Sequence, residues 1–75
     1  MEQYSLYIRR YRRHQNFDTL DELREETRKY FTPSEIAEDI VDRLTNFDRR
    51  KAGDGGYIRN TYQDFETYYY PEENN

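Results

Sequence analysis

The sequence lacks cysteine and tryptophan, and it has one histidine, two prolines and three glycines in 75 residues. Without cysteine, no disulfide and no thiolate nucleophile or thiolate metal ligand can form. His14 has no second imidazole at i+4, so we interpret it as a surface residue at a helix end rather than a general base or a metal ligand. We therefore expect no metal, no cofactor and no catalytic residue, and we predict that the chain is not an enzyme.

Long hydrophobic runs are also absent, because apolar residues make up 33% of the chain and charged residues 37%. No stretch approaches the about 20 apolar residues of a membrane span, or the apolar region of a signal peptide. This composition, without cysteine, is typical of a cytoplasmic chain. The length indicates one small domain, expected over residues 1–71, with a disordered tail at 72–75 after Pro71.

Tyrosine and charge dominate what is present. Nine tyrosines and four phenylalanines can form a dense core, provided that each buried hydroxyl finds water or a hydrogen-bond partner. The net charge of −4 is unevenly distributed, because residues 1–15 sum to +3 and the remaining sixty to −7. This imbalance argues against nucleic-acid binding by the whole surface and leaves room for a local basic face.

The stretch from Thr32 to Gly53 has the strongest helical signals. Thr32 can cap a helix, Pro33 suits its first position, and Glu35 can close a capping box onto Thr32. Apolar residues then recur at helical spacing: Ile36, Ile40, Val41, Leu44 and Phe47. We predict one amphipathic helix from Pro33 to about Ala52.

Three further segments are predicted as helices from the same periodicity. The first covers roughly residues 3–14, with apolar or aromatic residues at positions 4, 7, 8 and 11. The second opens at Asp18 or Thr19 and runs to about residue 31. The last is expected from about Tyr57 to Tyr70, although its β-branched and aromatic residues also suit a paired strand. The predicted architecture is an all-α, single-domain four-helix bundle.

Two sets of residues are candidates for contact with a protein partner. Consecutive tyrosines at 68–70 cannot all face one core from a helix, so Tyr68 and Tyr70 are candidate exposed contacts, or hydroxyls that reach water from the core edge. The other set is the row of carboxylates along the predicted third helix, which is either a solvated face or a binding face: Glu35, Glu38, Asp39 and Asp42.

A third set is dense in positive charge. It comprises four arginines in five positions, close in sequence to three tyrosines: Arg9, Arg10, Arg12 and Arg13. Arginine beside tyrosine can contact phosphates and stack on bases. The same residues can equally contact an acidic partner or the acidic helices of the chain itself.

The pattern Tyr4, Tyr7, Tyr11-Arg12 resembles the aromatic-x-x-Tyr-x-x-x-Tyr-Arg opening of the YozE-like family. Residues 18–23 are similar to the start of its second helix, and Phe65 and Tyr69 to its closing Phe-x-x-x-Trp helix, with tyrosine in place of the Trp. The third-helix entry also departs, because Thr32-Pro33 stands where that family has Phe-Pro. The resemblance implies a four-helix domain with a SAM-like fold and no assigned activity.

A second set of residues resembles the Hha/YmoA family, whose members modify nucleoid-associated repressors. Arg12, Arg13, Gln15 and the stretch 18–20 match its Arg-Arg-x-Gln-x-x-Asp-Thr-Leu sequence. Residues 35–37 and 48–50 look like its later motifs, at a spacing that differs by about a helical turn. This resemblance implies a small helical modulator, without a catalytic residue.

The sequence thus predicts a small helical regulator or inhibitor that binds a protein partner. A phage-encoded inhibitor whose carboxylates imitate nucleic-acid phosphates is one form of this hypothesis. The alternative is a modulator of a nucleoid-associated protein, or direct DNA binding through the Arg9–Arg13 face. Direct binding is disfavoured because most of the surface is acidic. The sequence does not determine the oligomeric state.

Overall fold

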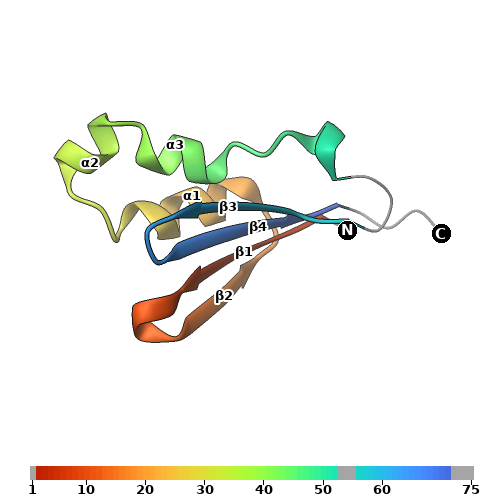
Figure 1. Cartoon of the computed structure of the whole chain (residues 1–75), viewed down its shortest axis with the longest axis horizontal. Coiled ribbons are helices and arrows are strands. Elements are labelled where there is room, and N and C mark those ends of the chain that lie inside the picture. Colours follow the sequence, from red (N-terminus) through yellow and green to blue (C-terminus); the bar gives the residue numbers. More distant parts are fainter. Residues whose placement is uncertain (1, 53–55, 72–75) are drawn as a thin grey trace.

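Figure 1 shows a computed structural model of the chain, in which residues 2–52 and 56–71 are described. It is a four-stranded antiparallel sheet with helices on one face. In chain order the elements are β1 (Gln3–Ile8), β2 (Arg13–Phe17), α1 (Leu20–Arg28), α2 (Pro33–Ala37), α3 (Ile40–Thr45), β3 (Ile58–Tyr62) and β4 (Phe65–Tyr70). The prediction of an all-α four-helix bundle is therefore wrong. The predicted tail at 72–75 lies outside the described residues.

The first and last strands are neighbours at the centre of the sheet, whose order is β2-β1-β4-β3. Tyr4 pairs with Tyr69 and Ile8 with Phe65, so six consecutive residue pairs join the two ends of the fold. Each central strand also pairs with its own hairpin partner. The sheet thus depends on contacts between residues about sixty positions apart.

The segment predicted as the first helix is the β1–β2 hairpin. Tyr4, Leu6 and Ile8 alternate along β1, and each is at most 3% exposed. Tyr4 and Ile8 therefore fit both the helical spacing and the alternation of a strand. In the strand that forms, Tyr7 lies on the opposite face of the sheet from Tyr4 and Ile8. A short 3₁₀ turn, η1 (Arg9–Tyr11), connects the strands. Pairing with β4 decides between the two patterns, because an isolated helix of this length is marginal.

The segment predicted as the last helix is the β3–β4 hairpin. Phe65, Thr67 and Tyr69 are buried on one face of β4, while Glu66 and Tyr68 alternate with them on the other. The turn is Gln63-Asp64, with Gln63 in the left-handed region at φ 52°. The β-branched and aromatic residues that suit a paired strand form one here.

The predicted third helix is present only in pieces. Thr32 and Glu35 form the expected capping box, and Pro33 occupies the first turn. The helix then breaks at Asp39, whose φ of 63° is left-handed, and α3 begins at Ile40. A second 3₁₀ turn, η2 (Arg49–Lys51), lies further along. The cap signals were local and are confirmed, whereas the predicted continuity to Ala52 is wrong.

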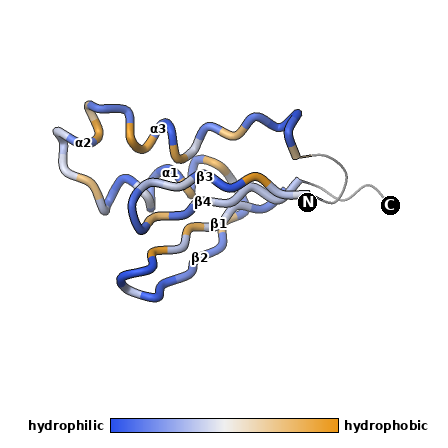
Figure 2. Tube along the Cα trace, viewed as in Figure 1, coloured by the Kyte–Doolittle hydropathy of each residue, from blue (hydrophilic) through white to orange (hydrophobic). Residues whose placement is uncertain are grey.

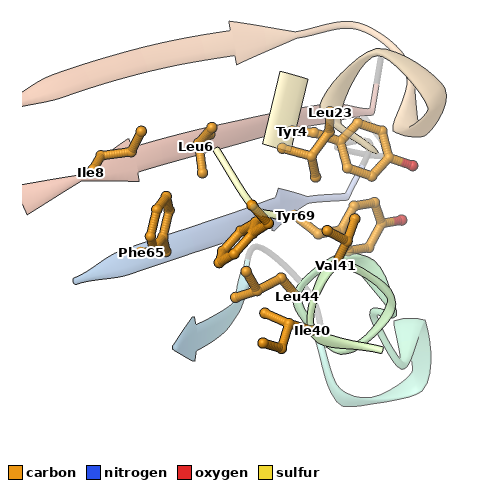
Figure 3. Close-up of a cluster of buried hydrophobic side chains, with 10 residues drawn as sticks. Tyr4, Leu6, Ile8, Leu23, Ile40, Val41, Leu44, Phe65 and Tyr69 are labelled. Carbon is orange, nitrogen blue, oxygen red and sulfur yellow. The ribbon is translucent and has the colours of Figure 1, made fainter. Parts of the chain in front are cut away.

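The core lies between the sheet and the helices (Figure 3). In the hydropathy colouring of Figure 2, α3 carries apolar stretches toward the sheet, and the tip of the β1–β2 hairpin is hydrophilic. Helix α1 packs against β1 and β2, while α3 packs against β3 and β4. The buried apolar residues come from every layer: Tyr4, Leu6, Ile8, Leu23, Phe31, Ile40, Val41, Leu44, Phe65 and Tyr69.

Polar side chains on the sheet donate hydrogen bonds to a backbone carbonyl that has no partner within its own short helix. The Leu44 carbonyl, at the end of α3, accepts from Asn60 Nδ2 at 3.0 Å and from the Thr67 hydroxyl. At the far end of the core, Glu2 accepts from the hydroxyls of Tyr4 and Tyr69, at 3.2 and 3.0 Å. The buried tyrosine hydroxyls therefore find the partners that a tyrosine-rich core requires.

Candidate binding surfaces

The helices cover one face of the sheet, and in the described part of the chain no element packs on the other. This open face carries four tyrosines from three segments of the chain, which we call the tyrosine face: Tyr7, Tyr57, Tyr68 and Tyr70. Tyr57 and Tyr70 are 57% and 39% exposed. The sequence-predicted candidates Tyr68 and Tyr70 lie here together because they are two apart on β4.

Three of these rings form a compact cluster. The ring centroids of Tyr57 and Tyr68 are 5.9 Å apart, and that of Tyr70 lies 6.0 Å from each. The planes of Tyr68 and Tyr70 differ by only 10°. Aromatic pairs at such distances attract one another, so the cluster presents a firm apolar surface with polar hydroxyl tips.

Polar groups surround a shallow hollow in this face. The Tyr68 hydroxyl donates to Glu66 Oε1, and Arg9 Nε lies 3.5 Å from Glu66 Oε2. The hydrogen bond to the Glu66 carboxylate, together with burial, raises the pKa of Tyr68. His14 lies on the neighbouring strand and meets the Tyr7 ring edge-on, with centroids 6.3 Å apart. The charged groups here thus have partners within the chain, and the tyrosines supply the open contact area.

The four arginines do not form one basic face. Arg10 makes a two-point ion pair with Asp64, and Arg9 donates to the Gln63 carbonyl at 2.7 Å and lies near Glu66. The β1–β2 hairpin is thereby tied to the β3–β4 turn. Arg9 and Arg10 therefore contact acidic residues of the chain itself, but these lie on the β3–β4 hairpin and not on the acidic helices that the sequence suggested as partners.

The other two arginines lie beside a separate hollow. It is lined by two arginines and two tyrosines, and we call it the arginine hollow: Tyr11, Arg12, Arg13 and Tyr30. The ring centroids of Tyr11 and Tyr30 are 6.4 Å apart. The Gln15 side-chain amide is oriented so that both its oxygen and its nitrogen have hydrogen-bond partners. In this orientation its oxygen accepts from Arg13 Nη2 at 2.8 Å. For Arg12, no ion pair is found among the described residues.

The acidic row is divided by the break between α2 and α3. Glu35 is half-buried, and its carboxylate accepts from the Thr32 backbone N–H at 2.9 Å within the capping box. Glu38, Asp39 and Asp42 are exposed. All four lie in the helical layer, on the opposite side of the sheet from the tyrosine face. The two predicted sets of partner-binding residues are therefore two separate surfaces.

Sequence reasoning missed Tyr7, Tyr57, His14 and Glu66 as neighbours of the predicted tyrosines. The signal that can find them is the alternation in β4, where residues 66, 68 and 70 share one face. Tyr7 and His14 join this face only through the registers of β1 with β4 and β2. The sequence of β4 shows the alternation of a strand, but it does not show which residues of β1 and β2 pair beside it.

Two negative findings apply to residues 2–52 and 56–71. No cluster of three or more His, Cys, Asp or Glu side chains there has a geometry suited to a metal ion. The longest helix in this part of the chain, α1, has nine residues, so none is long and apolar enough to cross a membrane.

No model of a known protein family, no curated protein and no solved structure matches this chain. Nothing in these comparisons identifies it as a YozE-like or Hha/YmoA protein. The helical folds that both resemblances imply also differ from the fold observed here, which contains a four-stranded sheet.

Proposed function

We propose that the chain is a non-enzymatic cytoplasmic domain that regulates or inhibits a protein partner by binding it through the tyrosine face. The cluster of Tyr57, Tyr68 and Tyr70 on an uncovered sheet face is the observation that supports this most directly. Tyrosine is enriched at the centres of protein interfaces, where charged residues are depleted. A tyrosine side chain also has a large contact area but few rotatable bonds, so little conformational entropy is lost when it is fixed in an interface.

The exposed carboxylates Glu38, Asp39 and Asp42 form a second candidate surface for a protein partner. An acidic surface suits a partner that normally binds nucleic acid, because carboxylates can imitate phosphates, and a phage-encoded inhibitor is one protein of this kind. These residues lie across the sheet from the tyrosine face, so one flat partner surface does not contact both sets. Variants can therefore test the two surfaces separately.

The experiment compares the wild-type chain with a Tyr57→Ser, Tyr70→Ser double variant. A binding partner is first captured from host extract, identified by mass spectrometry and purified, and its affinity for each variant is then measured by calorimetry. We expect the double variant to lose about tenfold or more in affinity, since tyrosines at interface centres are frequent hot spots. Tyr11→Ser is the matched control, because Tyr11 is 59% exposed on a different surface.

A second arm reverses charge at two exposed carboxylates, with Glu38→Lys and Asp42→Lys. If the tyrosine face binds the partner, this change alters mainly the association rate, as rim or distant charges do. If it abolishes binding while the tyrosine double variant binds normally, the acidic surface is the binding site and the tyrosine face is not.

A further inference from the structure

Charge is divided between the two layers of the fold. Residues 3–17, which form the β1–β2 hairpin, contain four arginines and no acidic residue. Residues 18–48, which include the three α-helices, contain ten acidic residues and four basic ones. An anionic ligand is therefore repelled from the helical side and attracted to the hairpin.

Within the hairpin, ion pairing leaves the positive charge concentrated at one place. Arg9 and Arg10 are paired with Glu66 and Asp64 across the sheet. Arg12 and Arg13 instead lie beside the arginine hollow, Arg12 just before the edge strand β2 and Arg13 at its first position. The Glu26 carboxylate of α1 is close enough for the Arg13 charge to lower its pKa, so Arg12 is the less compensated of the two. Arg12 is in the left-handed region at φ 51°, where η1 ends and β2 begins.

The same hollow has exposed aromatic surface. Tyr11 is 59% exposed, and Tyr30 is half-buried with its ring centroid 6.4 Å away. The Arg10 guanidinium lies 5.7 Å from the Tyr11 ring centroid, and the Arg10–Asp64 ion pair holds that guanidinium in place. Tyr11 is thus supported on one side by a fixed cation while its ring remains open to solvent.

We infer that the arginine hollow binds a nucleotide unit, with its phosphate on Arg12 and Arg13 and its base stacked on Tyr11. Planar guanidinium groups match phosphate oxygens, and stacking on tyrosine accepts any base. The unit is either a free nucleotide or one residue of a single strand. This site is separate from the tyrosine face, so it does not depend on the proposed function.

A carboxylate on an acidic protein segment also pairs with arginine, so the base is what distinguishes the ligand. An acidic side chain gains nothing from an open ring face, whereas each stacked base gains substantially from an aromatic platform. Two tyrosines beside two arginines therefore favour a nucleotide over an acidic peptide. A duplex is disfavoured because its bases are already stacked and cannot reach a ring.

The experiment measures binding of a short labelled oligothymidylate by fluorescence anisotropy over a range of salt concentrations, and of adenosine monophosphate by chemical-shift changes of the tyrosine rings. We expect Tyr11→Ser to weaken oligonucleotide binding by about fivefold or more. The Arg12→Gln, Arg13→Gln double variant should reduce the salt slope of log K by about 0.7, the value for the loss of one phosphate contact on a single strand.

Arg43→Gln is the matched control, because Arg43 is an exposed arginine on α3, away from the hairpin. It should bind like the wild type, and circular dichroism should show the same fold for all variants. Equal affinity for mononucleotide and oligonucleotide would indicate a free nucleotide as the ligand, and tighter oligonucleotide binding would indicate a strand; both outcomes support the site.

Three outcomes would overturn the inference. The first is no binding of either ligand with protein at about 100 µM in low salt, where non-specific binding is already measurable. The second is binding that Tyr11→Ser and the arginine double variant leave unchanged. The third is a polyglutamate peptide that binds as tightly as the oligonucleotide and is unaffected by Tyr11→Ser, because the site would then recognise acidic protein segments.

Discussion

Arg10 and Asp64 join the tips of the two β-hairpins. Arg10 Nε donates to Asp64 Oδ2 at 2.5 Å, and Arg10 Nη2 donates to Asp64 Oδ1 at 2.8 Å. The Arg10 backbone N–H also donates to the same carboxylate, at 3.3 Å. Two residues that are far apart in the sequence thus anchor the turn of one hairpin to the other. This ion pair removes one arginine from any basic binding face.

The Arg10–Asp64 pair predicts a dependence of stability on pH. The guanidinium of Arg10 lowers the pKa of Asp64 to about 2. Because the folded pKa lies below the unfolded value of about 3.9, the stabilisation is complete above pH 4 and is lost as the pH falls through 2. Urea melts from pH 5 to 2 should therefore show a steeper loss of unfolding free energy for wild type than for Asp64→Asn.

The control for this prediction is Asp42→Asn, which removes an exposed carboxylate from α3. It should follow the wild-type pH dependence. The difference between wild type and Asp64→Asn should also shrink at high salt, because Arg10 is exposed and Asp64 only half-buried, so salt screens the pair. Parallel pH profiles for wild type and Asp64→Asn would contradict the prediction.

Helix α3 is held by one fully buried stripe, so Ile40→Ala should be strongly destabilising. Ile40 is 1% exposed and packs in the core between the helices and the sheet (Figure 3). Truncation of a buried isoleucine to alanine removes apolar contacts and leaves a cavity, at a cost of about 2–5 kcal/mol. Denaturant melts should show this loss, whereas Arg43→Ala on the exposed side of α3 should change the stability by less than about 0.5 kcal/mol.

The break at Asp39 predicts an unusual response to glycine. Asp39 has φ 63° and ψ 25°, a conformation that costs an L-residue energy and that glycine adopts freely. Asp39→Gly should leave stability unchanged or raise it by up to about 1 kcal/mol. Asp42→Gly, within the right-handed α3, should lower it by roughly 0.5 kcal/mol. Thermal melts that rank the two variants in the opposite order would show that the helix runs through Asp39.

Local signals in the sequence determined the caps and one helix. Thr19 and Thr32 accept from the backbone N–H three residues later, as their spacing predicts, because a cap requires only a few consecutive residues. The apolar stripe at Ile40, Val41 and Leu44 is buried as predicted, although the helix around it is shorter. Helical spacing therefore predicted the buried face correctly within α3, where all of the spaced residues belong to one helix.

The break of the central helix was not visible in the sequence. No glycine or proline lies between Ile36 and Ile40, so the apolar spacing alone favoured continuity. A left-handed aspartate at position 39 is tolerated because its short polar side chain has a small steric cost there. The gain is tertiary, since the redirected α3 packs on β3 and β4.

The first and last segments of the chain are strands rather than helices because they pair with each other. The first segment carries apolar residues at positions 4, 7, 8 and 11, which suit a helix, and at 4, 6 and 8, which suit a strand. No local feature separates the two patterns, but β1 and β4 become the central strands once they pair. The tyrosine face follows from the same pairing, because register alone places Tyr7 beside Glu66 and Tyr68. The sequence by itself determined the caps, the apolar stripe of α3 and the lack of cysteine chemistry, whereas the sheet and its open face arose from contacts between distant residues.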